Sequence, residues 1–146
     1  MANWFECKIR FDKTMENGKI RKVSETYLVD ALTFTETERR FLEEVEPYMS
    51  GEFEVSGIRK ARIAELMESN DSNDDRWYKA KVTFITLDEK TAQEKHTGQT
   101  ILVQAHDLKS ALANFEKGMT GTMGDWILTA MSETPILDIF PYKKED

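Results

Sequence analysis

The sequence predicts an α+β protein made by internal duplication of a ββαβ(β) unit, on three observations. First, the stretch NWFECKIRF at residues 3–11 returns in altered form as RWYKAKVTF at residues 76–84. Second, apolar and polar residues alternate in both stretches, which is the period-two pattern of a strand with one buried face. Third, an amphipathic stretch with helical periodicity follows the β-rich segments in each half. Strands followed by a helix that covers one face of their sheet are typical of the α+β class.

The repeat extends through the chain in a constant order. Trp4 corresponds to Trp77 at an offset of 73, and one extra residue in a hairpin loop changes the offset to 74. At the second offset identical residues recur: Thr26, Leu28, Val29, Ala31 and Phe41 match Thr100, Leu102, Val103, Ala105 and Phe115. Near the end the offset returns to 73, so that GEF at residues 51–53 matches GDW at residues 124–126. We interpret these ordered matches as an internal duplication.

The predicted copies span residues 1–68 and 76–142, and the polar run SNDSNDD at residues 69–75 is a turn-prone connecting loop. One sheet and one helix in a copy of about 70 residues would be only marginally stable alone. We therefore expect the two copies to pack about a pseudo-twofold axis and to form one compact domain.

Each copy is predicted to begin with two strands. In the first copy Phe5, Cys7 and Ile9 alternate with charged residues, and a polar loop containing Gly18 leads to the β-rich run at residues 22–31. In the second copy the corresponding runs are residues 77–84 and 97–106.

A helix follows in each copy. The capping-box spacing of Thr35 and Glu38 predicts the start of the first helix, and Pro47 ends its apolar pattern. In the second copy Asp107 is the predicted N-cap, and Gly118 is placed to stop the helix.

The closing segments, residues 51–67 and 124–140, leave two structures open. Each segment is long enough for two short strands, or for one bent strand with a β-bulge near Gly57 and its counterpart Ala130. Each copy is accordingly ββαβ or ββαββ.

Composition restricts the functional classes. The 146 residues are 40% hydrophobic and 32% charged, which is typical of a soluble globular protein. No apolar run approaches the roughly 20 residues that cross a bilayer, and the charged first fifteen residues do not resemble a secretory signal, so we expect a cytoplasmic protein without membrane contact. The formal net charge of −7 repels phosphate backbones and disfavours unspecific nucleic-acid binding.

No standard catalytic motif is present in the sequence. A phosphate-binding GxxxxGK[ST] loop, GxGxxG, HExxH, CxxC and GxSxG are all missing. The glycine-rich run at residues 118–125 leaves a predicted helix and enters a predicted strand, which is the wrong polarity for a phosphate loop. The single cysteine, Cys7, excludes an internal disulfide and is expected to be buried on a strand. We assign no catalytic residue, cofactor or metal ligand, and the sequence favours a non-enzymatic protein.

Two polar features have both a chemical and a structural interpretation. The duplication places Glu65 and Asp138 at the same point of the two closing segments, where they could bind a divalent cation or act as acid and base. We favour exposed carboxylates on alternating strands. His106 next to Asp107 could be catalytic only with a partner and a cleft, whereas a helix cap by Asp107 accounts for these residues.

Basic residues gather in the first copy and are the candidate partner-binding residues: Lys19, Arg21, Lys22, Arg59, Lys60 and Arg62. If the two segments are neighbours, they form a local positive patch on an acidic molecule. Our first hypothesis is a non-enzymatic binding or adaptor protein that acts on a macromolecular partner, and a protein partner is favoured over nucleic acid.

Two other hypotheses belong to different classes. A single-stranded nucleic-acid-binding protein would use the same basic residues together with Trp4, Trp77 and Trp126, if these rings were exposed. We expect instead that these tryptophans are core or seam residues. The third hypothesis, which we favour less, is a metal-dependent enzyme using Glu65 and Asp138.

Three segments together resemble a family. YLVDALTFTETE, ILVQAHDLKSALANF and MGDWILTAMSETPILDIF are similar to an uncharacterised family of small bacterial and phage proteins, a domain of unknown function. The resemblance covers nearly the whole chain. It implies no activity, cofactor or catalytic residue, and the phage association fits a role in nucleic-acid metabolism or host takeover.

Overall fold

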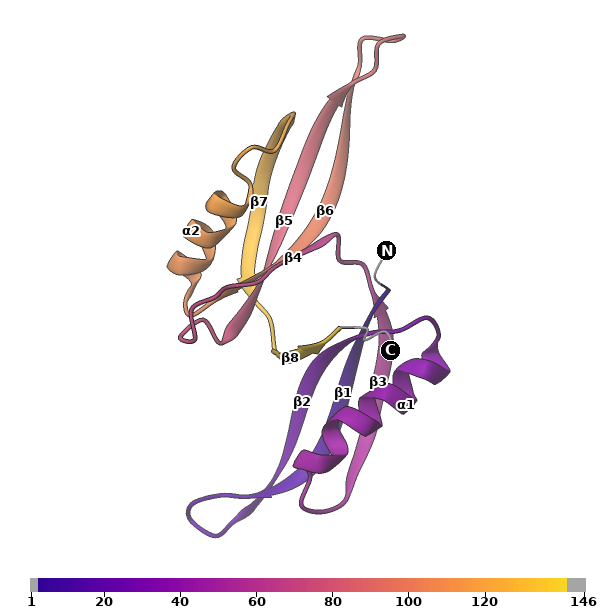
Figure 1. Ribbon diagram of the computed structural model, residues 1–146, viewed down its shortest axis with the longest axis vertical. Helices are drawn as coiled ribbons and strands as arrows, with labels where there is room; N and C mark the ends of the chain where they lie inside the picture. Colours follow the sequence, from indigo (N-terminus) through magenta and orange to yellow (C-terminus); the bar gives the residue numbers. More distant parts are fainter. Residues whose placement is uncertain (1–2, 142–146) are drawn as a thin grey trace. The chain divides into compact units, whose positions relative to one another are not determined.

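The computed structural model describes residues 3–141, which fold as two compact units. Of these residues, unit 1 contains 3–62 and 135–141, and unit 2 is Ile63–Thr134. Each unit is a four-stranded sheet with one α-helix on one face (Figure 1). The prediction of the α+β class is therefore confirmed.

Unit 1 is built on β1 (Trp4–Thr14), β2 (Ile20–Asp30), β3 (Phe53–Ala61) and β8 (Ile136–Phe140), in the order β3-β1-β2-β8. Strand β1 is antiparallel to β2 and β3, and β8 is parallel to β2. The helix α1 (Phe34–Val45) continues into the 3₁₀ turn η1 (Glu46–Tyr48). The buried residues below α1 come from both layers: Phe5, Cys7, Ile9, Val29, Ala31, Phe41 and Val45.

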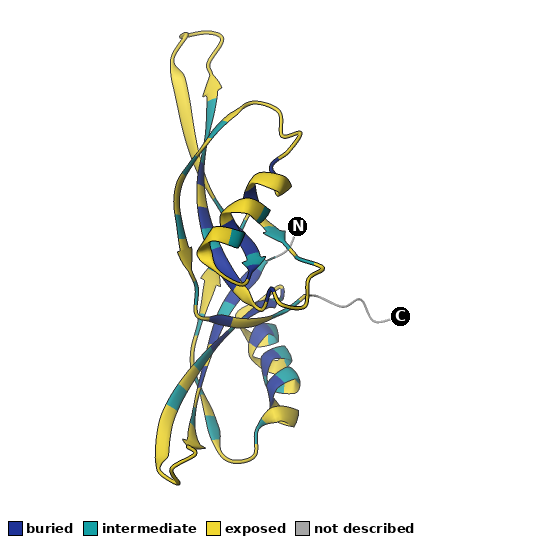
Figure 2. Ribbon diagram, turned by 90° about the vertical axis from the view of Figure 1, so that its left-hand side faces the viewer, coloured by how far each residue is buried: buried dark blue, intermediate teal, exposed yellow. Residues whose placement is uncertain are grey.

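Unit 2 has the equivalent order of strands across its sheet, when that order is counted from the opposite edge. Its strands are β4 (Glu65–Met67), β5 (Arg76–Leu87), β6 (Glu94–Ala105) and β7 (Asp125–Glu133), in the order β4-β6-β5-β7, with α2 (Leu108–Gly118) on one face. The core below α2 contains Ala80, Val82, Ile101, Val103, Phe115 and Met119. The alternation read from the sequence thus places the apolar side of each hairpin under its helix, and burial is concentrated there while the hairpin tips are exposed (Figure 2).

Each closing segment forms two strands, and the first of the two is bent by a bulge. Register shifts at Lys8/Ile9 and at Lys81/Val82 leave Ser56 and Thr129 as the extra residues of β3 and β7. Their hydroxyls donate to the carbonyls of Lys8 at 3.4 Å and Lys81 at 3.0 Å. Both structures left open by the sequence therefore occur together, and the bulges adjoin the predicted glycine and alanine.

The second strand of each closing segment joins the other sheet. β4 follows the first half of the chain but is parallel to β6 in unit 2, and β8 follows the second half but is parallel to β2 in unit 1. The compact units consequently follow strand pairing and not chain order. The copy boundaries at residues 68 and 76 and the pseudo-twofold axis stay predictions.

The helix starts correct one prediction and confirm another. α1 is capped by Thr33, whose hydroxyl accepts from the Glu36 amide at 3.1 Å, so the cap lies two residues before the predicted Thr35. The Glu36 side chain in turn accepts from the amide of Leu32, the residue before the cap, at 3.2 Å, so it satisfies a further backbone donor at the helix start. In α2 the predicted cap Asp107 accepts from the Ser110 amide at 2.7 Å, and the helix ends at Gly118 as expected.

Candidate binding groove

The structure separates the two basic clusters. Arg21 and Lys22 lie opposite Lys13 and Asp12, next to the β1–β2 turn, whereas Arg59 lies opposite Glu6 at the other end of β1. Seven residues of β1 at about 3.3 Å each put the clusters about 23 Å apart. The six basic residues therefore do not form the single positive patch that was expected if residues 19–22 and 59–62 were neighbours.

Each cluster has its own surroundings. Arg59 forms an ion pair with Glu6 at 3.0 Å, and Lys60 and Arg62 are exposed near it. Lys19, Arg21 and Lys22 are exposed at the tip of the hairpin. Partner binding by these residues stays a prediction.

Glu65 and Asp138 occupy corresponding places in different units. Glu65 lies opposite Ile101 on β4, and Asp138 lies opposite Tyr27 on β8. Both carboxylates are exposed. Among the described residues no group of three or more His, Cys, Asp or Glu side chains could hold a metal ion.

His106 has the partner that the sequence did not reveal. Its Nδ1 donates to Asp74 Oδ1 at 2.7 Å, and Ser69 donates to the other oxygen of Asp74 at 2.5 Å. Asn114 of α2 donates to the same carboxylate at 3.4 Å. The connecting loop is thereby fastened to the start and the middle of α2 within unit 2.

These hydrogen bonds shift both ionisations. The bonds from Ser69 and His106 lower the pKa of Asp74, and the bond to Asp74 raises the pKa of His106. Ser69 donates to the carboxylate of Asp74, and His106 Nε2 lies 3.8 Å from an oxygen of the Asp107 carboxylate. A Ser-His-Asp triad requires a serine hydroxyl that is hydrogen-bonded to the imidazole. Here Ser69 and His106 both bond to Asp74, so the three residues hold the connecting loop against the start of α2.

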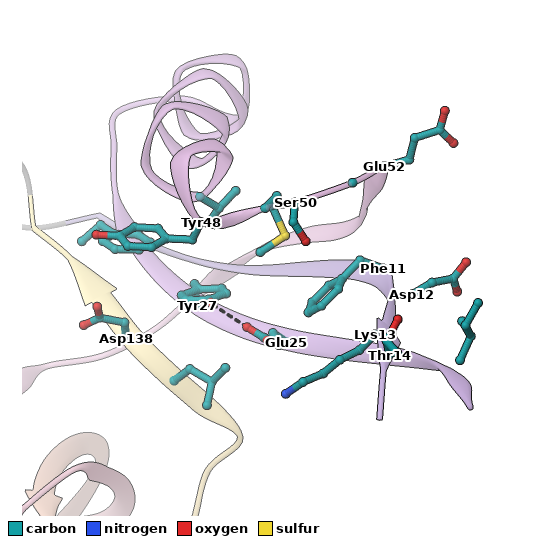
Figure 3. Close-up of a pocket in the computed structure, with 16 residues that line it drawn as sticks. Phe11, Asp12, Lys13, Thr14, Glu25, Tyr27, Tyr48, Ser50, Glu52 and Asp138 are labelled. Carbon is teal, nitrogen blue, oxygen red and sulfur yellow. Dashed lines mark hydrogen bonds between the residues drawn. The ribbon is translucent and has the colours of Figure 1, made fainter. Parts of the chain in front are cut away.

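A groove of about 1130 Å³ lies in unit 1, where the end of α1 and η1 leave part of the β1–β2 hairpin uncovered (Figure 3). Tyr27 and Phe140 form its floor, and Phe11 extends the floor along β1. The Tyr27 and Phe140 rings stack with centroids 5.5 Å apart and an interplanar angle of 12°. Tyr48 of η1 stands at the margin with 82% of its surface exposed. A concave surface that combines aromatic side chains with a few polar groups is a candidate ligand site.

The polar lining of the groove is mostly acidic. Glu25 and Asp138 lie on either side of the Tyr27 ring, Glu52 and Asp12 lie farther out, and Lys13 is the one basic residue of the lining (Figure 3). The Tyr27 hydroxyl donates to Glu25 Oε2 at 2.6 Å.

Burial raises the pKa of Tyr27 well above its ordinary value, and the bond to Glu25 and the charges of Glu25 and Asp138 raise it further. The phenol therefore stays neutral at physiological pH. An aromatic floor between two carboxylates is suited to a cationic group, which a ring face and a carboxylate both attract.

The sequence reasoning did not identify this groove, although the repeat carries a signal for it. At an offset of 74, Glu25, Tyr27 and Tyr48 correspond to Gln99, Ile101 and Thr122. Glu25, Tyr27 and Tyr48 thus have no acidic or aromatic counterpart in the other half of the chain, whereas Asp138 corresponds to the carboxylate of Glu65, which lies opposite Ile101. A comparison of chemically unlike positions between the copies would have found them.

The comparisons with known proteins agree with the resemblance noted in the sequence. No helix in the described part of the chain is long and apolar enough to cross a membrane. Neither the curated proteins nor the solved structures include a significant match to the chain. A family model described as Domain of unknown function (DUF4494) matches residues 3–142. Because this match covers nearly the whole sequence, the chain belongs to that family, to which no activity is assigned.

Proposed function

We propose that this chain is a non-enzymatic binding protein and that the groove of unit 1 receives a segment of a protein partner. The observation that carries the proposal is the open aromatic floor, with Tyr27 stacked on Phe140 and Tyr48 exposed beside it. Tyrosine at the margin of an apolar hollow is common at protein interfaces because it contributes contact area and a hydroxyl at little entropic cost.

The charge of the groove favours a protein over a nucleic acid. Glu25 and Asp138 would repel a phosphate backbone, and they attract a basic side chain. Trp4 and Trp77, which would have been the stacking surfaces for bases, are only 7% and 5% exposed. Trp126 is half-buried and packs edge-on against Phe115 with centroids 5.5 Å apart.

We also infer that the two halves of the chain, residues 1–68 and 76–142, descend from an internal duplication. The equal strand orders, the two bulges and the recurring identities support this origin. This origin matters for function because each groove residue of unit 1 can then be compared with the residue at the equivalent position of unit 2, where the same type of sheet forms without it.

A peptide-display selection against the whole chain tests the proposal. Enriched peptides should lose binding in Tyr48→Ala, which changes an exposed side chain, and in Tyr27→Ile, which introduces the residue found at the equivalent strand position of unit 2. Met123→Ala, at a residue 93% exposed in unit 2, is the matched control and should bind normally. Enrichment of peptides that bind all three variants equally would place the site elsewhere and refute the proposal.

A further inference from the structure

We propose that the segment received by the groove is an extended peptide that pairs with the free edge of β2 and places an arginine side chain over Tyr27, between Glu25 and Asp138. This inference rests on the proposed function and specifies its ligand. Three features of unit 1 support it: an uncovered strand edge, the direction of its amides, and the chemistry of the adjoining groove.

The edge of β2 is only partly covered. β8 pairs with β2 from Thr26 to Val29, while β1 pairs with β2 from Ile20 to Asp30. In the described part of the chain, residues 20–25 of β2 therefore have β1 on one side and no strand on the other. A stretch of this length accommodates a short added strand, which is how several peptide-binding domains capture extended ligands.

The hydrogen bonds at the ends of the hairpin show which groups face the open side. The Met15 amide donates to the Lys19 carbonyl, and the Ala31 amide donates to the Asn3 carbonyl, so the odd-numbered residues of β2 bond to β1. Antiparallel pairs alternate between bonded and non-bonded residues. The amide and carbonyl groups of Ile20, Lys22 and Ser24 consequently point toward the uncovered side.

The groove adjoins this edge. Ile20 and Glu25 of the free segment and Leu137 of β8 are all part of the groove lining. Alternate side chains of a strand point to opposite faces, so every second side chain of an added strand lies on the Tyr27 face of the sheet. That side chain reaches the floor without leaving the strand pairing.

Arginine fits the floor better than other side chains. Its planar guanidinium stacks on an aromatic ring and forms paired hydrogen bonds with a carboxylate, whereas lysine offers a point charge. Tyr27 supplies the ring face, and Glu25 and Asp138 supply the carboxylates. An acidic residue at the same place would meet two like charges.

The test uses acetylated and amidated peptides of alternating threonine and valine with a central arginine, lysine or glutamate. The arginine peptide should bind roughly tenfold more tightly than the glutamate peptide, a difference of about 1.4 kcal/mol, because Glu25 and Asp138 attract the guanidinium and repel a carboxylate. In ¹H-¹⁵N spectra its binding should slow the hydrogen exchange of the Lys22 and Ser24 amides. The Val23 amide, which already pairs with β1, should show little change.

Two perturbations separate strand addition from simple occupation of the groove. N-methylation of the peptide amides that face β2 should abolish binding, and methylation of the intervening amides should leave it within about twofold. Ser24→Pro removes an outward amide without removing a β1–β2 bond, so the variant should fold and lose peptide affinity. Glu25→Gln should reduce the preference for arginine over glutamate by about fivefold.

The outcomes distinguish this inference from the proposed function. Peptides that bind through Tyr27 and Tyr48 but leave the Lys22 and Ser24 amides unprotected would refute strand addition and leave the groove as the site. Concentration-dependent protection of these amides without peptide would identify a second copy of the chain as the occupant and also refute the inference. Equal affinities of the arginine and glutamate peptides would refute the assignment of the side chain.

Discussion

Truncation of Phe115 tests whether α2 is held on its sheet by the contacts described. Phe115 is fully buried in unit 2 and meets Trp126 edge-on with ring centroids 5.5 Å apart. Phe115→Ala removes the ring from a core whose other members include residues of β4, β5, β6 and β7, which cannot all move inward. A large aromatic residue replaced by alanine in such a site costs about 3–5 kcal/mol, and loss of the aromatic pair is part of that figure.

That loss is large for a unit of this size. A unit of about 70 residues is stable by roughly 4–10 kcal/mol, so Phe115→Ala should lower the melting temperature of unit 2 by about 12 °C or more. Urea unfolding followed by the exchange of β5 and β6 amides measures the change within unit 2 alone. Leu112→Ala, on the same helix and 41% exposed, is the matched control and should cost less than about 1.5 kcal/mol.

The result that would refute this reasoning is a cost below about 1.5 kcal/mol for Phe115→Ala, or equal costs for the two variants. Either would mean that α2 does not rest on the sheet through Phe115. Phe41→Ala gives an independent check, because Phe41 is the fully buried counterpart in unit 1 and should cost a similar amount.

The remaining predictions concern ionisation and charge. The raised pKa of His106 and the lowered pKa of Asp74 imply that their pairing stabilises unit 2 fully between the unfolded pKa of aspartate and that of histidine. It should weaken as pH rises through the folded pKa of His106 or falls through that of Asp74, and His106→Gln should flatten the alkaline side of a stability profile measured by thermal unfolding. Burial, with a smaller effect from the charge of Glu6, raises the pKa of the Cys7 thiol to about 12. A thiol reagent at pH 8 should therefore label the native chain only at the rate of unfolding, and rapid labelling would contradict the buried position of Cys7. Charge reversal at Lys19, Arg21 and Lys22 and, separately, at Arg59, Lys60 and Arg62 should affect partner capture independently because the clusters are about 23 Å apart, and a combined variant whose effect differs from the sum of the two would contradict this separation. Labelled single-stranded DNA or RNA should show no binding that weakens steeply between about 50 and 200 mM salt, and a steep salt slope would favour the nucleic-acid hypothesis.

Local features of the fold could be predicted from the sequence because their causes are local. Alternation around Cys7 and Ala80 identified the central strands, and Asp107 and Gly118 marked the limits of α2. The cap of α1 was displaced because two threonines stand near acidic residues at the same spacing, and the choice of Thr33 over Thr35 depends on where the chain leaves β2.

Long-range partners could not be predicted in the same way. The short apolar sequences of β4 and β8 fit the edge of either sheet, so the exchange of closing strands depends on how the chain leaves each bulged strand. The contact of His106 with Asp74 depends on the path of a polar loop that has no periodicity. The groove forms because α1 and η1 end before the end of the β1–β2 hairpin. The relative lengths of a helix and a hairpin that pack together cannot be read from the pattern of either segment alone.

The second copy separates what the fold requires from what the groove adds. Tyr27 lies opposite Cys7 on the helix-facing side of its sheet, and Ile101 lies opposite Ala80 at the equivalent point of unit 2. Ile101 is buried and supports the same pairing without a ring, a hydroxyl or an adjacent carboxylate at position 99. The sheet therefore does not need a tyrosine hydrogen-bonded to a glutamate at this place. Tyr27 also packs against Phe41 and Phe140, and ligand binding is the role that we propose for the ring, the negative charge and the exposed Tyr48 beside them.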